Sequence, residues 1–197
     1  IINNKNKKKI ICLTAYSKNI AEVLDNHVDI ILVGDSLGSV LYNYKTTQKV
    51  TLQMMIEHSK SVKQGVRKSL LVVDMPHNTY KNKRDAYKNA KKIMVSVKPD
   101  AIKLEGGKKV VNIISYLTRK KIPVMGHLGI LPQSHKGKFK YKGKTDLEKK
   151  RLSRGTPMGV VAAARHPTPD DRETVAEGIR AQDADLQVGN LGPTVFK

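Results

Sequence analysis

The sequence predicts an α/β fold in which a parallel sheet is covered by helices. Short apolar runs rich in β-branched residues recur along the first 152 residues, and amphipathic stretches lie between them. The two kinds of segment alternate, as they do when parallel strands are joined by helices. This pattern indicates either an open, doubly wound sheet or a sheet closed into a barrel.

Five apolar runs have the length and composition of buried strands, because they are nearly continuous in Val, Ile and Leu. They occupy residues 10–16, 29–35, 69–75, 101–106 and 122–129. Four stretches between them carry apolar residues at helical spacing, with Gly, Asn or Pro near several ends. These expected helices cover residues 17–27, 51–66, 83–97 and 108–121. The sequence therefore predicts about five β-α units.

A change in composition divides the chain near residue 152. Residues 1–152 carry 32 basic and 11 acidic side chains, whereas residues 153–197 carry 5 and 6. Lysine is absent between Lys150 and Lys197, while alanine becomes frequent. We therefore expect two parts, a partial α/β domain at 1–152 and a distinct tail at 153–197. The tail is either a natural linker with a helix or a junction with unrelated coding sequence, and 159–165 is its most strand-like stretch.

The net charge of +20 raises the possibility of nucleic-acid binding. However, the excess consists mainly of lysines spread over all expected helices and loops, which is typical of solvated faces. The chain has few aromatic residues for base stacking, 7 Tyr and 2 Phe. One cysteine excludes a disulfide framework, and no apolar run is long enough to span a bilayer. We expect a cytoplasmic protein that binds neither nucleic acid nor membranes.

Polar residues end four of the five expected strands. Asp35, Asp74 and His127 each follow an apolar run, and Glu105 ends another with Lys103 two residues before it. The carboxyl ends of parallel strands meet at the edge where α/β proteins bind ligands. Converging carboxylates suit Mg²⁺, which could in turn hold a 2-oxo acid. Taken singly, each residue also has a structural explanation: a helix cap, a solvated Lys–Glu pair, or a packed histidine.

Several strings in the first 152 residues resemble those of the ketopantoate hydroxymethyltransferase family. They occur in the expected order: LTAY, DIILVGDSLG, VTLQMMIEHSKSV, LLVVDMP, IKLEGG, IPVMGHLGILPQS and KYKGK. The resemblance implies a (β/α)₈ TIM-type barrel of the phosphoenolpyruvate/pyruvate type, usually a homo-decamer, in pantothenate biosynthesis. It also implies hydroxymethyl transfer from 5,10-methylenetetrahydrofolate to the 2-oxo acid 3-methyl-2-oxobutanoate, giving 2-dehydropantoate.

Matched residue by residue, the resemblance assigns a metal set and a substrate set. It implies that Mg²⁺ is bound by Asp35 and Asp74, with a contribution from Glu105. It implies that the oxo acid contacts a set of five residues: Asp35, Ser36, Asp74, Lys103 and His127. Of these, His127 is expected only to line or orient the site.

The resemblance ends near residue 152, whereas the family continues through further β-α units, one of which carries a glutamate that acts as the base. The tail offers no acidic residue after a strand-like run, so no catalytic base is assigned. We therefore expect a truncated barrel of about five β-α units with exposed apolar surface and little turnover on its own. The alternative is a non-catalytic binding or assembly scaffold derived from the barrel.

Overall fold

The computed structural model describes residues 10–127, Gln133 and residues 160–161. Strands and helices alternate through the main part. The strands are β1 (Cys12–Thr14), β2 (Ile30–Val33), β3 (Leu70–Asp74), β4 (Ala101–Glu105), β5 (Val124–His127) and β6 (Val160–Val161). The helices are α1 (Lys18–Leu24), α2 (Leu37–Tyr42), α3 (Leu52–Gly65), α4 (Lys83–Val97) and α5 (Val111–Arg119), with short 3-10 turns at Thr47–Lys49 and Gly107–Val110.

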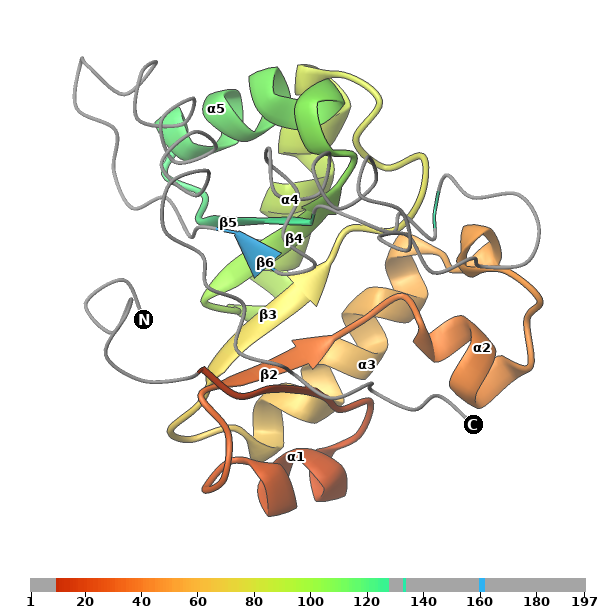
Figure 1. The fold of residues 1–197 in the computed structure, drawn as a ribbon, viewed down its shortest axis with the longest axis vertical. Coiled ribbons are helices and arrows are strands. Elements are labelled where there is room, and N and C mark those ends of the chain that lie inside the picture. The colour runs from red at the N-terminus through yellow and green to blue at the C-terminus, as the bar shows by residue number, and fades with distance from the viewer. Residues whose placement is uncertain (1–9, 128–132, 134–159, 162–197) are drawn as a thin grey trace, which may run out of the picture.

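The sheet follows the order of the chain, from β1 to β6. β1 to β5 are parallel neighbours, which confirms the prediction of five β-α strands (Figure 1). The registers place Asp74 beside Lys103 and Glu105 beside His127. Val160 and Val161 add an antiparallel bridge to β5, opposite His127 and Gly126. The expected strand at 159–165 is thus present at two residues, and the rest of it lies outside the described residues.

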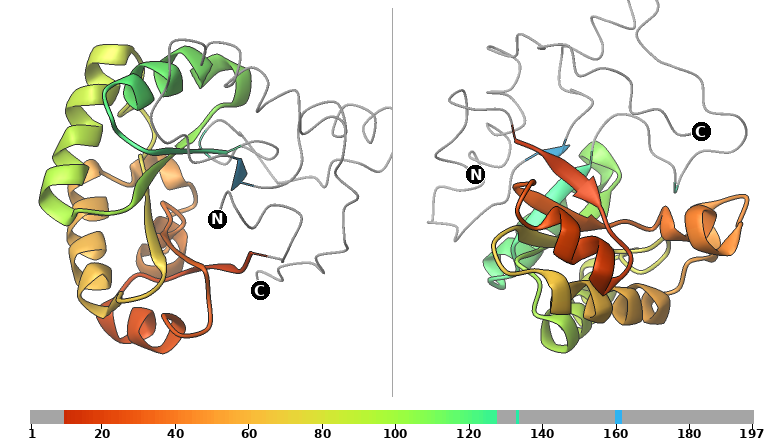
Figure 2. Two further views of the ribbon diagram at one scale, coloured as in Figure 1. Left: turned by 90° about the vertical axis from the view of Figure 1, so that its left-hand side faces the viewer. Right: turned by 90° about the horizontal axis from the view of Figure 1, so that it is seen from below.

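The helices α1, α3, α4 and α5 lie along one face of the curved sheet (Figure 2). Alternate strand residues, such as Ile31, Val73 and Leu104, point to this face and form the main core. The intervening residues form a smaller cluster on the other face, which includes Ile30, Val72, Ala101 and Met125. Asp74 and Lys103 lie on this second face, because they follow Val72 and Ala101 by two residues and side chains two residues apart in a strand share a face.

Side-chain caps fix the beginning of two long helices. The hydroxyl of Thr51 accepts a hydrogen bond from the backbone N–H of Met54 at the start of α3. The side chain of Asn82 accepts one from Asp85 N–H at the start of α4. Both are typical N-cap interactions, which satisfy amides that have no partner within the helix.

The segment between β2 and α3 differs from the sequence prediction, which assigned no helix there. Residues 37–42 form α2, a helix of only 6 residues. A helix this short has too few residues to show an amphipathic pattern in the sequence. Burial of Leu37 and Gly38 packs α2 against the rest of the domain. A Cβ atom on Gly38 would lie 2.6 Å from the side chain of Val50, so this contact requires glycine. The close packing fixes the chain immediately after Asp35 and Ser36.

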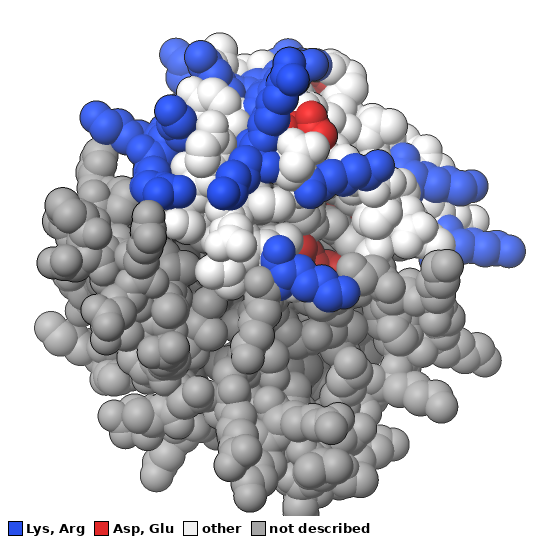
Figure 3. Space-filling model, turned by 90° about the horizontal axis from the view of Figure 1, so that it is seen from above, with Lys and Arg blue, Asp and Glu red and all other residues white. Residues whose placement is uncertain are grey.

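Lys and Arg side chains project at many points of the described surface (Figure 3). Several large apolar side chains are exposed as well, as expected for a partial barrel. They include Ile11 and Leu13 at β1 and Ile20 and Val23 on α1. None of the helices in the described part of the chain combines the length and apolarity needed to cross a bilayer.

Candidate functional site

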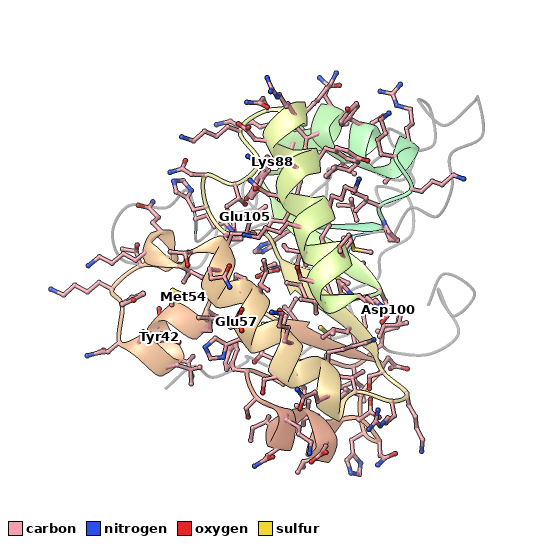
Figure 4. The ribbon with its side chains drawn as sticks, turned by 180° about the vertical axis from the view of Figure 1, so that it is seen from behind. Tyr42, Met54, Glu57, Lys88, Asp100 and Glu105 are labelled. Atoms are coloured by element: carbon pink, nitrogen blue, oxygen red, sulfur yellow. The ribbon has the colours of Figure 1, made fainter. Side chains whose placement is uncertain are left out.

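The polar strand-end residues lie together at the carboxyl edge of the sheet. Asp74 ends β3, Glu105 ends β4 and His127 ends β5, while Asp35 follows β2 by two residues. Glu105 is the last residue of β4 and Asp100 directly precedes its first (both labelled in Figure 4), and the site lies at the Glu105 end. All three carboxylates are buried, with Asp35, Asp74 and Glu105 exposed by 7%, 3% and 7%.

Lys103 supplies positive charge within this group of carboxylates. Its Nζ atom lies 2.5 Å from Oδ1 of Asp74, and both side chains are buried. Burial would lower the pKa of Lys103, but the charge and hydrogen bond of Asp74, with the charges of Asp35 and Glu105, hold it above its usual value. Lys103 is therefore protonated. The alternative explanation, a solvated pair with Glu105, does not hold, because the partner of Lys103 is Asp74 on the neighbouring strand.

Asp35 is buried beside another carboxylate, and both effects disfavour its charged form. Burial and, after it, the charge of Asp74 raise its pKa from 3.8 to about 7, against the opposing effects of Gln133 and Lys103. Its backbone N–H donates to Oδ2 of Asp74 at 3.2 Å, so the two residues are adjacent. A bound cation stabilises the charged form of a buried carboxylate more than that of an exposed one, because the buried charge is less screened by water.

Glu105, at the end of β4, contacts His127 at the end of the neighbouring strand β5. The Oε2 atom of Glu105 is 3.3 Å from Nδ1 of His127. Its Oε1 atom accepts a hydrogen bond of 2.8 Å from the backbone N–H of Gln133. Glu105 is thus held by partners from β5 and from the segment that follows β5.

Ser36 is positioned beside Asp35 at the start of α2. Its hydroxyl is hydrogen bonded to the hydroxyl of Tyr16 at 2.8 Å, which links the residues after β1 and β2. A Cβ atom on Gly34 would approach Oγ of Ser36 to 2.8 Å, so glycine there leaves room for this arrangement. Tyr16 belongs to the LTAY string, but sequence reasoning gave it no role at the site.

Gln133 and Tyr80 are further members of the site that sequence reasoning missed. The amide nitrogen of Gln133 donates to Oδ2 of Asp35 at 2.7 Å, and its amide oxygen contacts the Tyr80 hydroxyl. That hydroxyl also accepts from the backbone N–H of Glu105 at 3.3 Å. The PQS string contains Gln133, but a polar residue in a loop carries no sequence signal of burial.

The donor chemistry of the site fits a hard divalent cation. Within the described part of the chain, no three Asp, Glu, His or Cys side chains are arranged to hold a metal together. Asp35 and Asp74 nevertheless offer adjacent carboxylates, and Mg²⁺ commonly uses one or two protein carboxylates with water or substrate in its remaining positions. The pair, with Glu105 close to Asp35 through Gln133, matches that requirement.

The architecture defines the class of protein as a partial α/β barrel with a polar site at its strand ends. Solved structures agree on this fold. A phosphonopyruvate hydrolase aligns with a TM-score of 0.51 at 11% identity, over 63% of this chain and 48% of its own. The complex of phosphonopyruvate hydrolase with oxalate and Mg²⁺ aligns with a TM-score of 0.50, over 62% and 48%. The expected fold class, with five β-α units of a barrel-type sheet, is confirmed.

Sequence comparison identifies the family. The model of the ketopantoate hydroxymethyltransferase family matches residues 1–159. The 3-methyl-2-oxobutanoate hydroxymethyltransferase of Pelagibacter ubique is 64% identical over 157 residues, which are 80% of this chain and 61% of that protein. The Rhizobium etli enzyme of that name is 46% identical, over 76% and 56%. The chain belongs to this family and spans 54–61% of the length of three curated relatives that it matches.

Proposed function

We propose that this chain provides the metal-binding and oxo-acid-binding half of a 3-methyl-2-oxobutanoate hydroxymethyltransferase. The observation that carries the proposal is the buried group of Asp35, Asp74 and Glu105 around Lys103 at one edge of the sheet. Family membership supports the reaction class, in which 5,10-methylenetetrahydrofolate donates a hydroxymethyl group to the oxo acid.

The described side chains have separable roles in this proposal. Asp35 and Asp74 hold Mg²⁺, and Glu105 contributes negative charge to the same region. When bound, the metal polarises the ketone of the oxo acid. Lys103 provides a positive charge for the substrate carboxylate, and the neighbouring carboxylates, Asp74 above all, hold its proton in place against the effect of burial. Ser36 hydrogen bonds to the substrate, and His127 orients it through the contact with Glu105.

Binding can be tested by titrating Mg²⁺ and 3-methyl-2-oxobutanoate into the chain by isothermal titration calorimetry. We expect the oxo acid to bind only when Mg²⁺ is present, because the metal completes its site. Asp74→Asn should abolish both binding events. Asp85→Asn is the matched control, because the described hydrogen bonds of Asp85 are to Asn82 and to none of the proposed site residues; this variant should bind both ligands normally. Absence of both binding events in the unmodified chain would favour the scaffold alternative.

Catalysis is tested separately by Mg²⁺-dependent exchange of the C3 proton of the oxo acid into deuterated water. No described residue is assigned as the base that removes this proton. We therefore expect binding with little exchange, measured by NMR of the oxo acid. Rapid exchange would show that the chain contains a base and would contradict this assignment.

A further inference from the structure

We propose that Gln133 is a positioning residue that fixes Asp35 and Glu105 relative to each other. This inference rests on the proposed metal and oxo-acid site, and it adds a residue that acts through the proposed ligands. Gln133 is 4% exposed, and it is bonded to elements far apart in the sequence. It therefore has both the burial and the contacts that a positioning role requires.

The contacts of Gln133 join the ends of β2, β3 and β4. Its Nε2 atom donates to Oδ2 of Asp35 at 2.7 Å and to the backbone carbonyl of Met75 at 3.0 Å. Its backbone N–H donates to Oε1 of Glu105 at 2.8 Å. One residue thus bonds to two proposed acidic groups that lie two strands apart in the sheet.

The remaining polar atoms of Gln133 are satisfied too. Its amide oxygen contacts the Tyr80 hydroxyl, and its backbone carbonyl accepts from Nε2 of Gln48 at 3.0 Å. Two acceptors face the amide nitrogen and a hydroxyl faces the amide oxygen, so only one orientation of the amide fits. A buried polar network with every member bonded is rigid, and its partial loss is costly.

This arrangement has a direct effect on the ligand geometry of Asp35. The bond from Gln133 occupies Oδ2, so rotation of the carboxylate would break it. A side chain held in this way loses less conformational entropy when it binds a cation. Residues that orient metal ligands typically change metal affinity by about 10-fold to 100-fold when they are lost.

The experiment is titration of Mg²⁺ alone into the chain, with the oxo acid and folate left out. Gln133→Met keeps the length of the side chain but removes the amide, and we expect Mg²⁺ affinity to fall about tenfold or more. Gln53→Met is the matched control, because Gln53 is exposed on α3 and bonds only to Glu57 among the contacts described for it. Its Mg²⁺ affinity should be unchanged.

A second measurement separates positioning from a general effect on the fold. The carboxyl-carbon NMR resonance of Asp35 in the metal-free chain should shift in Gln133→Met and stay in place in Gln53→Met. If Gln133→Met fails to fold by circular dichroism, Gln133→Asn tests the same bond, because its amide is one methylene too short to reach Asp35. It too should bind Mg²⁺ more weakly.

Each outcome is decisive. Equal Mg²⁺ affinity in Gln133→Met and the unmodified chain would overturn the positioning role and leave the proposed function standing. Tighter binding in the variant would also overturn it, since Gln133 would then be competing with the cation. An unmodified chain that binds no Mg²⁺ would overturn the proposed function and the inference together.

Discussion

Lys103 is the residue whose charge opposes three buried carboxylates, those of Asp74, Asp35 and Glu105. Replacing it by Met leaves the Asp74 carboxylate buried without its partner. We expect Lys103→Met to lower the free energy of unfolding by about 3–5 kcal/mol, as is typical when one member of a buried ion pair is removed. Urea denaturation followed by circular dichroism measures this loss.

The matched control for this prediction is Lys60→Met on α3. Lys60 lies 3.3 Å from Glu57, but the two side chains are 47% and 55% exposed. Exposed pairs contribute little, so this change should cost less than about 1 kcal/mol. Equal costs for the two variants would show that the Lys103–Asp74 contact does not stabilise the fold.

Asp35 should make the stability of the metal-free chain depend on pH. Its pKa is about 7 in the folded chain, above its ordinary value of 3.8. Between these values the folded state binds more protons than the unfolded state, so the free energy of unfolding should fall as the pH rises. Urea denaturation from pH 5 to 8 should show this decline, and Asp35→Asn should reduce it. An unchanged slope in the variant would contradict the assignment.

At the scale of secondary structure, Asp25 ties the end of α1 to the segment between α3 and β3. Its carboxylate accepts hydrogen bonds from the backbone N–H groups of Arg67, Lys68 and Ser69. The Ser69 hydroxyl donates back to the carbonyl of Asp25 at 3.0 Å. Burial raises the pKa of Asp25, but these bonds outweigh it and hold the pKa below its usual value.

Removing this connection should destabilise the N-terminal side of the sheet. We expect Asp25→Ala to cost about 2–3 kcal/mol, because one buried and two partly buried backbone amides lose their acceptor. Asp85→Ala, in the first turn of α4, should cost about 1 kcal/mol or less. The difference between Asp25→Ala and the unmodified chain should disappear as the pH falls through the folded pKa, since protonation removes the same charge. Thermal unfolding at several pH values tests both statements.

The sequence predicted the elements that repeat and missed those that depend on contacts. Runs of Val, Ile and Leu identified β2, β3 and β4, and long amphipathic stretches identified α3 and α4. Because parallel strands align their carboxyl ends, Asp74, Glu105 and His127 could be placed at one edge from the order of residues alone. The helix α2 and the bonds of Gln133 arise from tertiary packing, which leaves no periodic pattern in the chain.

For the whole molecule, the exposed apolar residues of β1 and α1 predict self-association. Val23 on α1 is 67% exposed, the same helix carries the exposed Ile20, and β1 is the first strand in the order of the sheet. We expect Val23→Lys to reduce the mass of the assembly in sedimentation velocity, because a charge would have to be buried at the contact.

The matched control is Val95→Lys on the lysine-rich α4, where Val95 is 66% exposed. This variant should leave the sedimentation profile unchanged. A monomeric unmodified chain, or equal effects of the two variants, would contradict association through β1 and α1.

The bridge between β5 and β6 has a consequence for any enlargement of the sheet. Val160 and Val161 run antiparallel to β5, and they pair with the backbone of His127 and Gly126 at the edge of that strand. Closure of a barrel on that side requires a further strand parallel to β5, and this strand would hydrogen bond to the same backbone groups of β5. β6 and such a parallel strand cannot both pair with the same edge of β5. Val160 and Val161 must therefore separate from β5 before a further strand can extend the sheet toward a closed barrel on that side.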